Sequence, residues 1–247
     1  MTGPNANSMR SLNGGWSYSW QGEKVEEFAQ TYHTILEALV AKNGDRNVIY
    51  KPGVQYNEDG SYWEEKDAGI SDAVNAASKV DYVVLCLGEN SYTEKPGDLH
   101  ELTLSSLQIQ LAQALIATKK PVILVLNEGR PRLINQIESE LAGVIQLYLP
   151  GNYGGEALAG VLFGEINPSG KLPYTYPKFA NTLITYDHKP SEEQNKMEGM
   201  YDYESDFAIQ YPFGHGLSYT SFEYTDLKLS AYELSGDDKL EVSFIVT

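Results

Sequence analysis

The chain has 247 residues, and 18 Lys and Arg against 34 Asp and Glu give it a formal net charge of −16. Its length suits one large domain, or one domain and part of another, and its single cysteine excludes a scaffold held by intrachain disulfides. The negative charge disfavours nucleic acid and anionic membrane as partners, whereas a neutral ligand such as a sugar meets no electrostatic penalty.

The first part of the chain alternates between helical and strand-like patterns. Thr34 and Glu37 form a capping box, which predicts a helix beginning directly after Thr34. Residues 47–51 are a weak strand candidate, and the Ala-rich segment 70–80 predicts a second helix. The β-branched apolar segment 82–87 predicts a strand buried on both faces.

The same alternation continues to about residue 164. Apolar residues at helical spacing predict a helix over 107–115, and residues 122–126 predict another buried strand. A helix opened by a proline is expected over 131–141, followed by a strand over 144–149 and a helix over 157–162. Alternating strands and helices predict the α/β class: a mainly parallel sheet flanked by helices, an α/β sandwich.

The pattern changes after Pro177. Residues 178–210 are polar with little periodicity, so we expect a long surface segment there. From residue 222 apolar residues recur at every second position in two runs, as in the opening hairpin of a β-sandwich. The predicted division is an α/β domain over 1–215 and the truncated start of a further domain over 216–247, with both ends expected to be cuts in a longer protein.

Ligands of a parallel α/β sheet bind in the loops that follow the carboxyl ends of its strands. The loops predicted there are 88–98, 127–130 and 150–155, and a Gly-rich stretch over 13–22 precedes the first long helix. These loops are therefore where we look for chemistry.

Two kinds of side chain in these loops are candidates for a site, and each has a structural alternative. Trp16 and Trp20 suit stacking on a sugar, but they equally suit the packing of a loop. Glu89 and Glu94 suit acid/base chemistry, although most glutamates in loops are simply solvated.

Other signals for chemistry are weak. The four histidines lack metal-ligand spacing, and no phosphate-binding loop or nucleophile elbow occurs, so we expect no metal and no cofactor. Cys86 lies inside a predicted buried strand, where an inert core thiol is expected. Gly154 and Gly155 precede a predicted helix, a position where anions can bind but which glycines alone do not establish.

Several motifs together resemble a signature of glycoside hydrolase family 3. They run in the family's order from the first residues to about position 224. These motifs are Gly-Pro-Asn-Ala at 3–6, Gly-Gly-Trp at 14–16, Trp-Gln-Gly at 20–22, and the stretches 150–157, 161–164, 167–173 and 211–222. The resemblance is to the family's second domain, an α/β sandwich, and to the start of its fibronectin-III-like third domain.

The resemblance implies an exo-acting, retaining β-glycosidase of the β-glucosidase or β-xylosidase type. Its Asp nucleophile would lie on an N-terminal (β/α)₈ barrel, which nothing in this chain resembles, so we expect the chain alone to be inactive. The general acid/base is placed on Glu94, with Glu89 as second choice. Trp20 resembles a residue that stacks on the sugar beyond the cleaved bond, and Trp16 is the less favoured alternative.

The implied partners are a β-linked oligosaccharide or glycoside and the protein's own N-terminal barrel, in a periplasmic or secreted location. Two other interpretations remain open. One is a non-catalytic carbohydrate-binding or scaffold domain, which titration with sugars under tryptophan fluorescence would test. The other is a flavodoxin-like nucleotide binder, against which the charge and the lack of a phosphate loop both argue.

Overall fold

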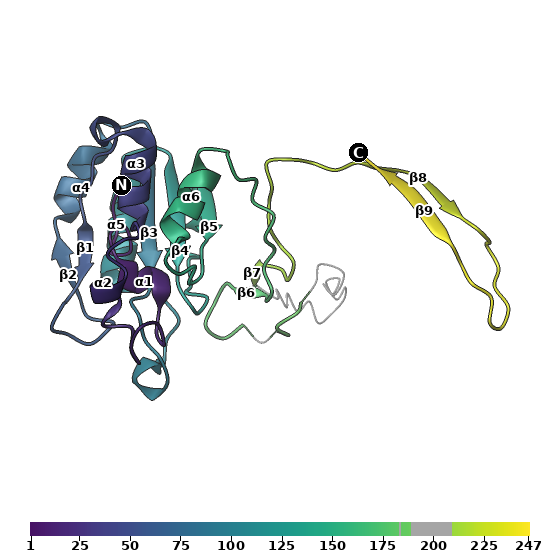
Figure 1. Cartoon of the computed structure of the whole chain (residues 1–247), viewed down its shortest axis with the longest axis horizontal. Helices are drawn as coiled ribbons and strands as arrows, with labels where there is room; N and C mark the ends of the chain where they lie inside the picture. The colour runs from purple at the N-terminus through teal and green to yellow at the C-terminus, as the bar shows by residue number, and fades with distance from the viewer. Residues whose placement is uncertain (183, 189–208) are drawn as a thin grey trace, which may run out of the picture.

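A computed structural model describes residues 1–182, 184–188 and 209–247. Its centre is a parallel sheet with the order β3-β4-β5, formed by Val83–Gly88, Val122–Asn127 and Gly143–Gln146 (Figure 1). The segment at the N-terminus runs along β3, where Thr2 forms a parallel bridge with Leu85. The α/β sandwich class is therefore confirmed, and so are the buried strands β3 and β4, whereas β5 is only partly buried.

Helices cover both faces of this sheet. Helices α3 and α6 pack against each other, as do α4 and α5. None of the helices in the ranges described above is long and apolar enough to cross a membrane. The helices are α1 (Met9–Asn13), α2 (Val25–Phe28), α3 (Ile35–Asn43), α4 (Ile70–Ala77), α5 (Ser106–Ile116) and α6 (Gly154–Leu162), with short 3₁₀ turns η1 (Asp45–Asn47), η2 (Lys95–Gly97) and η3 (Glu138–Glu140).

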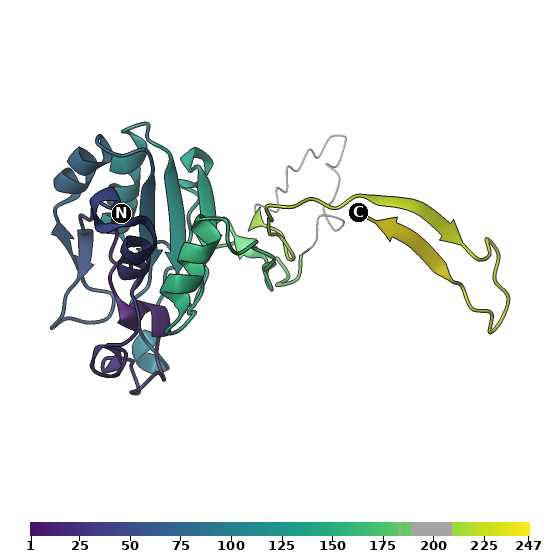
Figure 2. The same ribbon diagram turned by 45° about the horizontal axis from the view of Figure 1, so that its top comes forward.

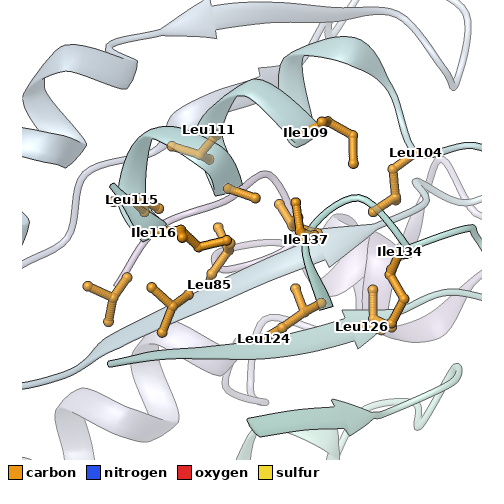
Figure 3. Close-up of a cluster of buried hydrophobic side chains, with 14 of the residues drawn as sticks. Leu85, Leu104, Ile109, Leu111, Leu115, Ile116, Leu124, Leu126, Ile134 and Ile137 are labelled. Carbon is orange, nitrogen blue, oxygen red and sulfur yellow. The ribbon is translucent and has the colours of Figure 1, made fainter. Parts of the chain in front are cut away.

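The strands divide the core because their side chains alternate between the two faces. Leu85 and Leu124 point into a cluster with residues of α5, such as Leu111, which Figure 3 shows. Cys86 and Val125 belong to a second cluster that includes residues of α1, α3 and α6. Burial of apolar surface on both faces is the main stabilisation of this layer, and it makes Cys86 the inert core thiol that was expected.

Local signals explain how α3 begins and how α6 packs. The Glu37 amide donates to Thr34 Oγ1 (3.2 Å) and the Thr34 amide donates to Glu37 Oε2 (2.8 Å), so the predicted capping box is confirmed. A Cβ on Gly155 would lie 2.7 Å from the carbonyl oxygens of His33 and Thr34. Gly155 is thus explained by the close approach of α6 to the start of α3, and Gly154 by its contact with the Pro150 side chain, which a Cβ would approach to 2.3 Å.

Two predicted elements are wrong. Residues 131–141 form no α-helix, because the Leu133 amide bonds to the carbonyl of Leu102 (3.0 Å) and draws the chain alongside the 102–103 segment. Their apolar side chains are nevertheless buried, as Ile134 and Ile137 show. Residues 47–51 are not a strand, because the 3₁₀ turn η1 takes up their beginning.

An antiparallel ribbon that the sequence did not reveal follows this segment. It pairs β1 (Gly53–Tyr56) with β2 (Glu65–Ala68). The exposed, charged residues of β2 hide the alternation by which strands are normally found.

The C-terminal part contains two short antiparallel pairs. β6 (Tyr176–Pro177) pairs with β7 (Ile209–Tyr211), and β8 (Tyr224–Leu229) pairs with β9 (Val242–Val246), which confirms the predicted hairpin. Figure 1 shows this hairpin reaching away from the sandwich. Most of the predicted surface segment 178–210 lies outside the described residues, and the division at residue 215 stays a prediction.

Candidate active site

The loops that follow the strands meet at one edge of the molecule. Asn5 joins two of them, because its Nδ2 donates to the carbonyls of Glu89 (3.0 Å) and Asn127 (3.1 Å), at the ends of β3 and β4. The Gly151 amide donates to the carbonyl of Leu12 (2.9 Å), which brings in the loop after β5. In Figure 2 the purple loop after α1 and the teal turn η2 lie at this same edge.

The two loops that carry the candidate residues are held together by Gln21. Its Nε2 donates to the Thr93 carbonyl (3.1 Å), and its Oε1 accepts from the Thr93 amide (3.0 Å). The Ser91 hydroxyl donates to the Gln21 carbonyl (2.6 Å). Trp20 and Glu94 are the chain neighbours of this paired Gln21 and Thr93, so the fold brings the predicted aromatic loop and the predicted acid loop together.

Both tryptophans of the aromatic loop are exposed. Trp16 is 67% exposed and Trp20 47%, so neither is a core residue. The Trp16 amide donates to the Trp20 carbonyl (2.9 Å), which closes the loop into a tight turn. Tyr18 stacks on Phe28 with 5.5 Å between ring centroids and anchors the loop to α2. The side chains at 16 and 20 are left facing solvent with broad aromatic surfaces.

Glu94 is exposed, and its backbone is unusual. Its φ of 53° and ψ of −153° lie in a region that residues with a Cβ rarely adopt. The Gly97 amide donates to the Glu94 carbonyl (2.8 Å), which fixes the backbone in the turn η2. Within the described residues the Glu94 carboxylate has no hydrogen-bond or ion-pair partner, so it is free to meet a ligand or another domain.

Glu89, only 3% exposed, has the opposite environment. Its Oε1 accepts from Arg130 Nη2 (2.8 Å) and Arg132 Nη1 (2.9 Å), and its Oε2 accepts from the Tyr92 hydroxyl (2.9 Å). The carboxylate thus forms ion pairs with two guanidinium groups, as a buried charge requires. This residue therefore organises the base of the loop.

The two arginines differ in what else they hold. Arg132 Nε donates to the Leu102 carbonyl (2.9 Å) and its Nη2 to the Thr103 carbonyl (2.5 Å), away from the candidate loop. Arg130 Nη1 donates to the Gly97 carbonyl (2.5 Å), at the far end of the 88–98 loop. Arg132 thus fastens Glu89 to the 102–103 segment, and Arg130 fastens it to η2.

Glu128, directly after β4, is fully buried. Its Oε1 lies 2.9 Å from the Tyr176 hydroxyl and accepts from the Arg132 amide (3.2 Å), while among the described residues its Oε2 has no partner. Burial raises the pKa of Glu128 to about 8, and the nearby Glu89 carboxylate acts in the same direction. At neutral pH this carboxyl is mostly a neutral acid.

Sequence reasoning placed residues 127–130 at the strand ends but gave Glu128 and Arg130 no role, and it did not single out Arg132 or Gln21. A charged residue directly after a buried strand was the available signal for Glu128. The two arginines follow β4, and the acidic 88–98 loop follows β3. Their proximity can be inferred only when β3 and β4 are known to be neighbours in the sheet.

Comparison with known proteins gives a consistent family. Residues 1–219 match the glycosyl hydrolase family 3 C-terminal domain. The lysosomal beta glucosidase of Dictyostelium discoideum is 37% identical over 235 residues, which cover 93% of this chain and 27% of that protein. The chain thus spans only about a quarter of this relative's length.

Solved structures agree. A β-glucosidase from Erythrobacter marinus superposes with a TM-score of 0.71 and 29% identity, covering 99% of this chain and 34% of that one. A mutant β-glucosidase from Listeria innocua in complex with laminaribiose gives a TM-score of 0.69 and 26% identity, covering 93% of this chain and 30% of that one.

Proposed function

Because the chain belongs to glycoside hydrolase family 3, we propose that it is the C-terminal part of a retaining, exo-acting β-glucosidase-like enzyme in which Glu94 is the general acid/base. The observation that carries the proposal is the contrast between two carboxylates of one loop. Glu94 is exposed and unpaired among the described residues, whereas Glu89 is buried between Arg130 and Arg132.

An acid/base must exchange its proton with the leaving group and with water. Glu89 cannot do so readily, because Arg130, Arg132 and Tyr92 already occupy both of its carboxylate oxygens and its 3% exposure leaves no room for a sugar. Glu94 meets the steric requirement, and the strained backbone at this position is a feature that clusters at active sites. The contacts therefore favour Glu94 over the second choice, Glu89.

Retaining hydrolysis needs a second carboxyl about 5–5.5 Å from the acid/base to act as nucleophile. We place that nucleophile on another part of the full-length enzyme, since the chain spans 27% of the Dictyostelium relative. The substrate would be a β-linked oligosaccharide or glycoside, which agrees with the laminaribiose bound by the Listeria enzyme. The exposed ring of Trp20, with Trp16 as alternative, would stack on the sugar beyond the cleaved bond.

The test is Glu94→Ala in the full-length enzyme with β-glucosides of different leaving groups. For substrates with poor leaving groups, kcat/KM should fall by about 10²–10⁴-fold, because their departure needs a proton. For a dinitrophenyl glycoside kcat/KM should change little, while kcat falls and azide restores it by replacing the water that the base activates.

The matched control is Glu58→Ala, which removes an exposed loop glutamate outside the strand-end loops and should behave as wild type. Equal losses of Glu94→Ala on all leaving groups, without rescue by azide, would exclude this residue as the acid/base. If Glu89→Gln gave the leaving-group signature instead, the role would move to Glu89.

A further inference from the structure

One side chain, Arg130, holds both ends of the loop that carries Glu94. At the start of the loop its Nε and Nη2 donate to Glu89 Oε1 (3.0 and 2.8 Å), and its own amide donates to Glu89 Oε2 (3.3 Å). At the end of the loop its Nη1 donates to the Gly97 carbonyl (2.5 Å). A single guanidinium group thus closes the 88–98 loop into a ring.

Two tyrosines complete this closure. The Arg130 guanidinium lies 3.8 Å from the centroid of the Tyr92 ring, inside the loop, in a cation–π contact. The Tyr62 hydroxyl donates to the Gly97 carbonyl (3.1 Å) and accepts from Arg130 Nη2 (3.2 Å). The turn beside Glu94 is therefore held at the Gly97 carbonyl by two groups: the Arg130 guanidinium, and Tyr62 of the β1–β2 connection.

The chemistry of arginine suits this task better than that of lysine. Different nitrogens of the guanidinium group serve the two acceptors: Nη1 donates to the Gly97 carbonyl, and Nε and Nη2 donate to the Glu89 carboxylate. A planar fork of five N–H donors reaches both at once. An ammonium group can keep the charge opposite Glu89 but lacks the fixed second direction. Arg130 is itself three-quarters buried, with 25% of its side chain exposed, so its geometry is constrained by packing.

We propose that Arg130 is a positioning residue for the general acid/base: it fixes the 88–98 loop so that Glu94 is presented in one orientation. The inference rests on the proposed function of Glu94. Arg130 does not touch the reacting atoms, and it acts through the loop. Its loss should leave the nucleophile unaffected and weaken only those steps that need the proton of Glu94.

The test compares Arg130→Lys, Glu94→Ala and the double variant in the full-length enzyme. Arg130→Lys keeps a positive charge beside Glu89, so the buried carboxylate stays paired. We expect kcat/KM for poor leaving groups to fall by about 10- to 100-fold, as a small misplacement of a catalytic group can cause, with little change for the dinitrophenyl glycoside. The double variant should be no worse than Glu94→Ala, because both changes remove the same proton transfer.

The informative readout is the ratio of kcat/KM for a substrate with a poor leaving group to kcat/KM for the dinitrophenyl glycoside. A lower fraction of folded enzyme changes both values equally and cancels in this ratio. Hydrogen exchange of the 91–98 amides gives an independent measure, and it should accelerate in Arg130→Lys. Tyr62→Phe removes one donor to the Gly97 carbonyl. It should change the kcat/KM ratio and the hydrogen exchange in the same direction as Arg130→Lys, but by a smaller amount. Arg46→Lys, at an exposed arginine of η1, is the control with unchanged ratio and exchange.

The outcomes separate the two proposals. If Glu94→Ala shows the leaving-group signature but Arg130→Lys lowers kcat/KM equally for all substrates, or not at all, the positioning role is overturned while the acid/base role stands. Additive losses in the double variant would overturn it equally. If Glu94→Ala lacks the signature, the function proposed for Glu94 fails and the role of Arg130 fails with it.

Discussion

At the scale of single residues, the backbone of Glu94 carries a measurable cost. A φ of 53° with a ψ of −153° brings Cβ into conflict with its own backbone, and such a conformation costs on the order of 1–3 kcal/mol. Alanine keeps the Cβ and the strain, whereas glycine removes both. We expect Glu94→Gly to have a free energy of unfolding about 1 kcal/mol higher than Glu94→Ala, after the backbone entropy of glycine is taken into account.

Urea denaturation of the two variants measures this difference. Gly214→Ala serves as a comparison, because that glycine also has positive φ (80°) but lies outside the 88–98 loop, and there alanine should destabilise. A Glu94→Gly variant that is less stable than Glu94→Ala would show that the position carries no strain.

Glu128 should make the stability depend on pH. Its folded-state pKa of about 8 exceeds the ordinary value of 4.5 because the carboxyl is buried. Between these values the unfolded chain is ionised while the folded chain holds the proton, so unfolding releases a proton and stability falls as pH rises. Below pH 4.5 the group has no effect, and above pH 8 the loss is complete.

The hydrogen bonds of Tyr176 agree with a protonated Glu128. The Tyr176 hydroxyl lies 2.6 Å from the Arg132 carbonyl and 2.9 Å from Glu128 Oε1, yet it has one proton to donate. A protonated Glu128 supplies the second. Glu128→Gln should therefore abolish a decline of up to about 1.4 kcal/mol per pH unit between pH 5 and 8. Urea denaturation across this pH range measures the effect, with Glu58→Gln as the control. The expectation is contradicted if the free energy of unfolding of Glu128→Gln declines with pH as steeply as that of Glu58→Gln.

At the scale of elements, the spacing of apolar residues was sufficient to predict a helix or strand that buries one or both of its faces in the core. The strands at 82–87 and 122–126 were predicted because apolar residues fill both faces, and their burial agrees. The 131–141 segment has helix-like spacing too, but its backbone pairs with the 102–103 segment, a contact remote in sequence. The β1–β2 ribbon was missed for a different reason: β2 is charged and only partly buried, so it lacks the alternating apolar pattern.

The candidate site, too, could be predicted only in part from the sequence. The 88–98 loop was predicted as functional because it follows a strand end, and the 13–22 loop because it places two tryptophans among glycines. The Gln21–Thr93 pair shows that the two loops meet. The partners of Glu89 were not predictable, because Arg130 and Arg132 are more than 40 positions away in the chain. Only the parallel register of β3 and β4, which sets Gly88 opposite Asn127, brings them together.

At the scale of the whole molecule, the edge that carries the exposed aromatic rings also presents the Glu94 carboxylate, but retaining hydrolysis needs two carboxyls close together, one acting as nucleophile. The other glutamate of the 88–98 loop, Glu89, is paired with two arginines. We therefore expect the purified chain to hydrolyse no aryl β-glucoside, dinitrophenyl glucoside included. This substrate needs no acid, so it isolates the lack of a nucleophile.

The assay is release of dinitrophenolate by the purified chain, with the full-length enzyme as positive control and its Glu94→Ala variant as comparison. The variant should still release a first equivalent, because its nucleophile is intact, while the chain alone releases none. Turnover by the chain alone that survives Glu94→Ala and Glu89→Gln would require a nucleophile elsewhere in its residues and would overturn the shared active site. Inactivity that ends when the N-terminal part of the enzyme is added back would place the second carboxyl there.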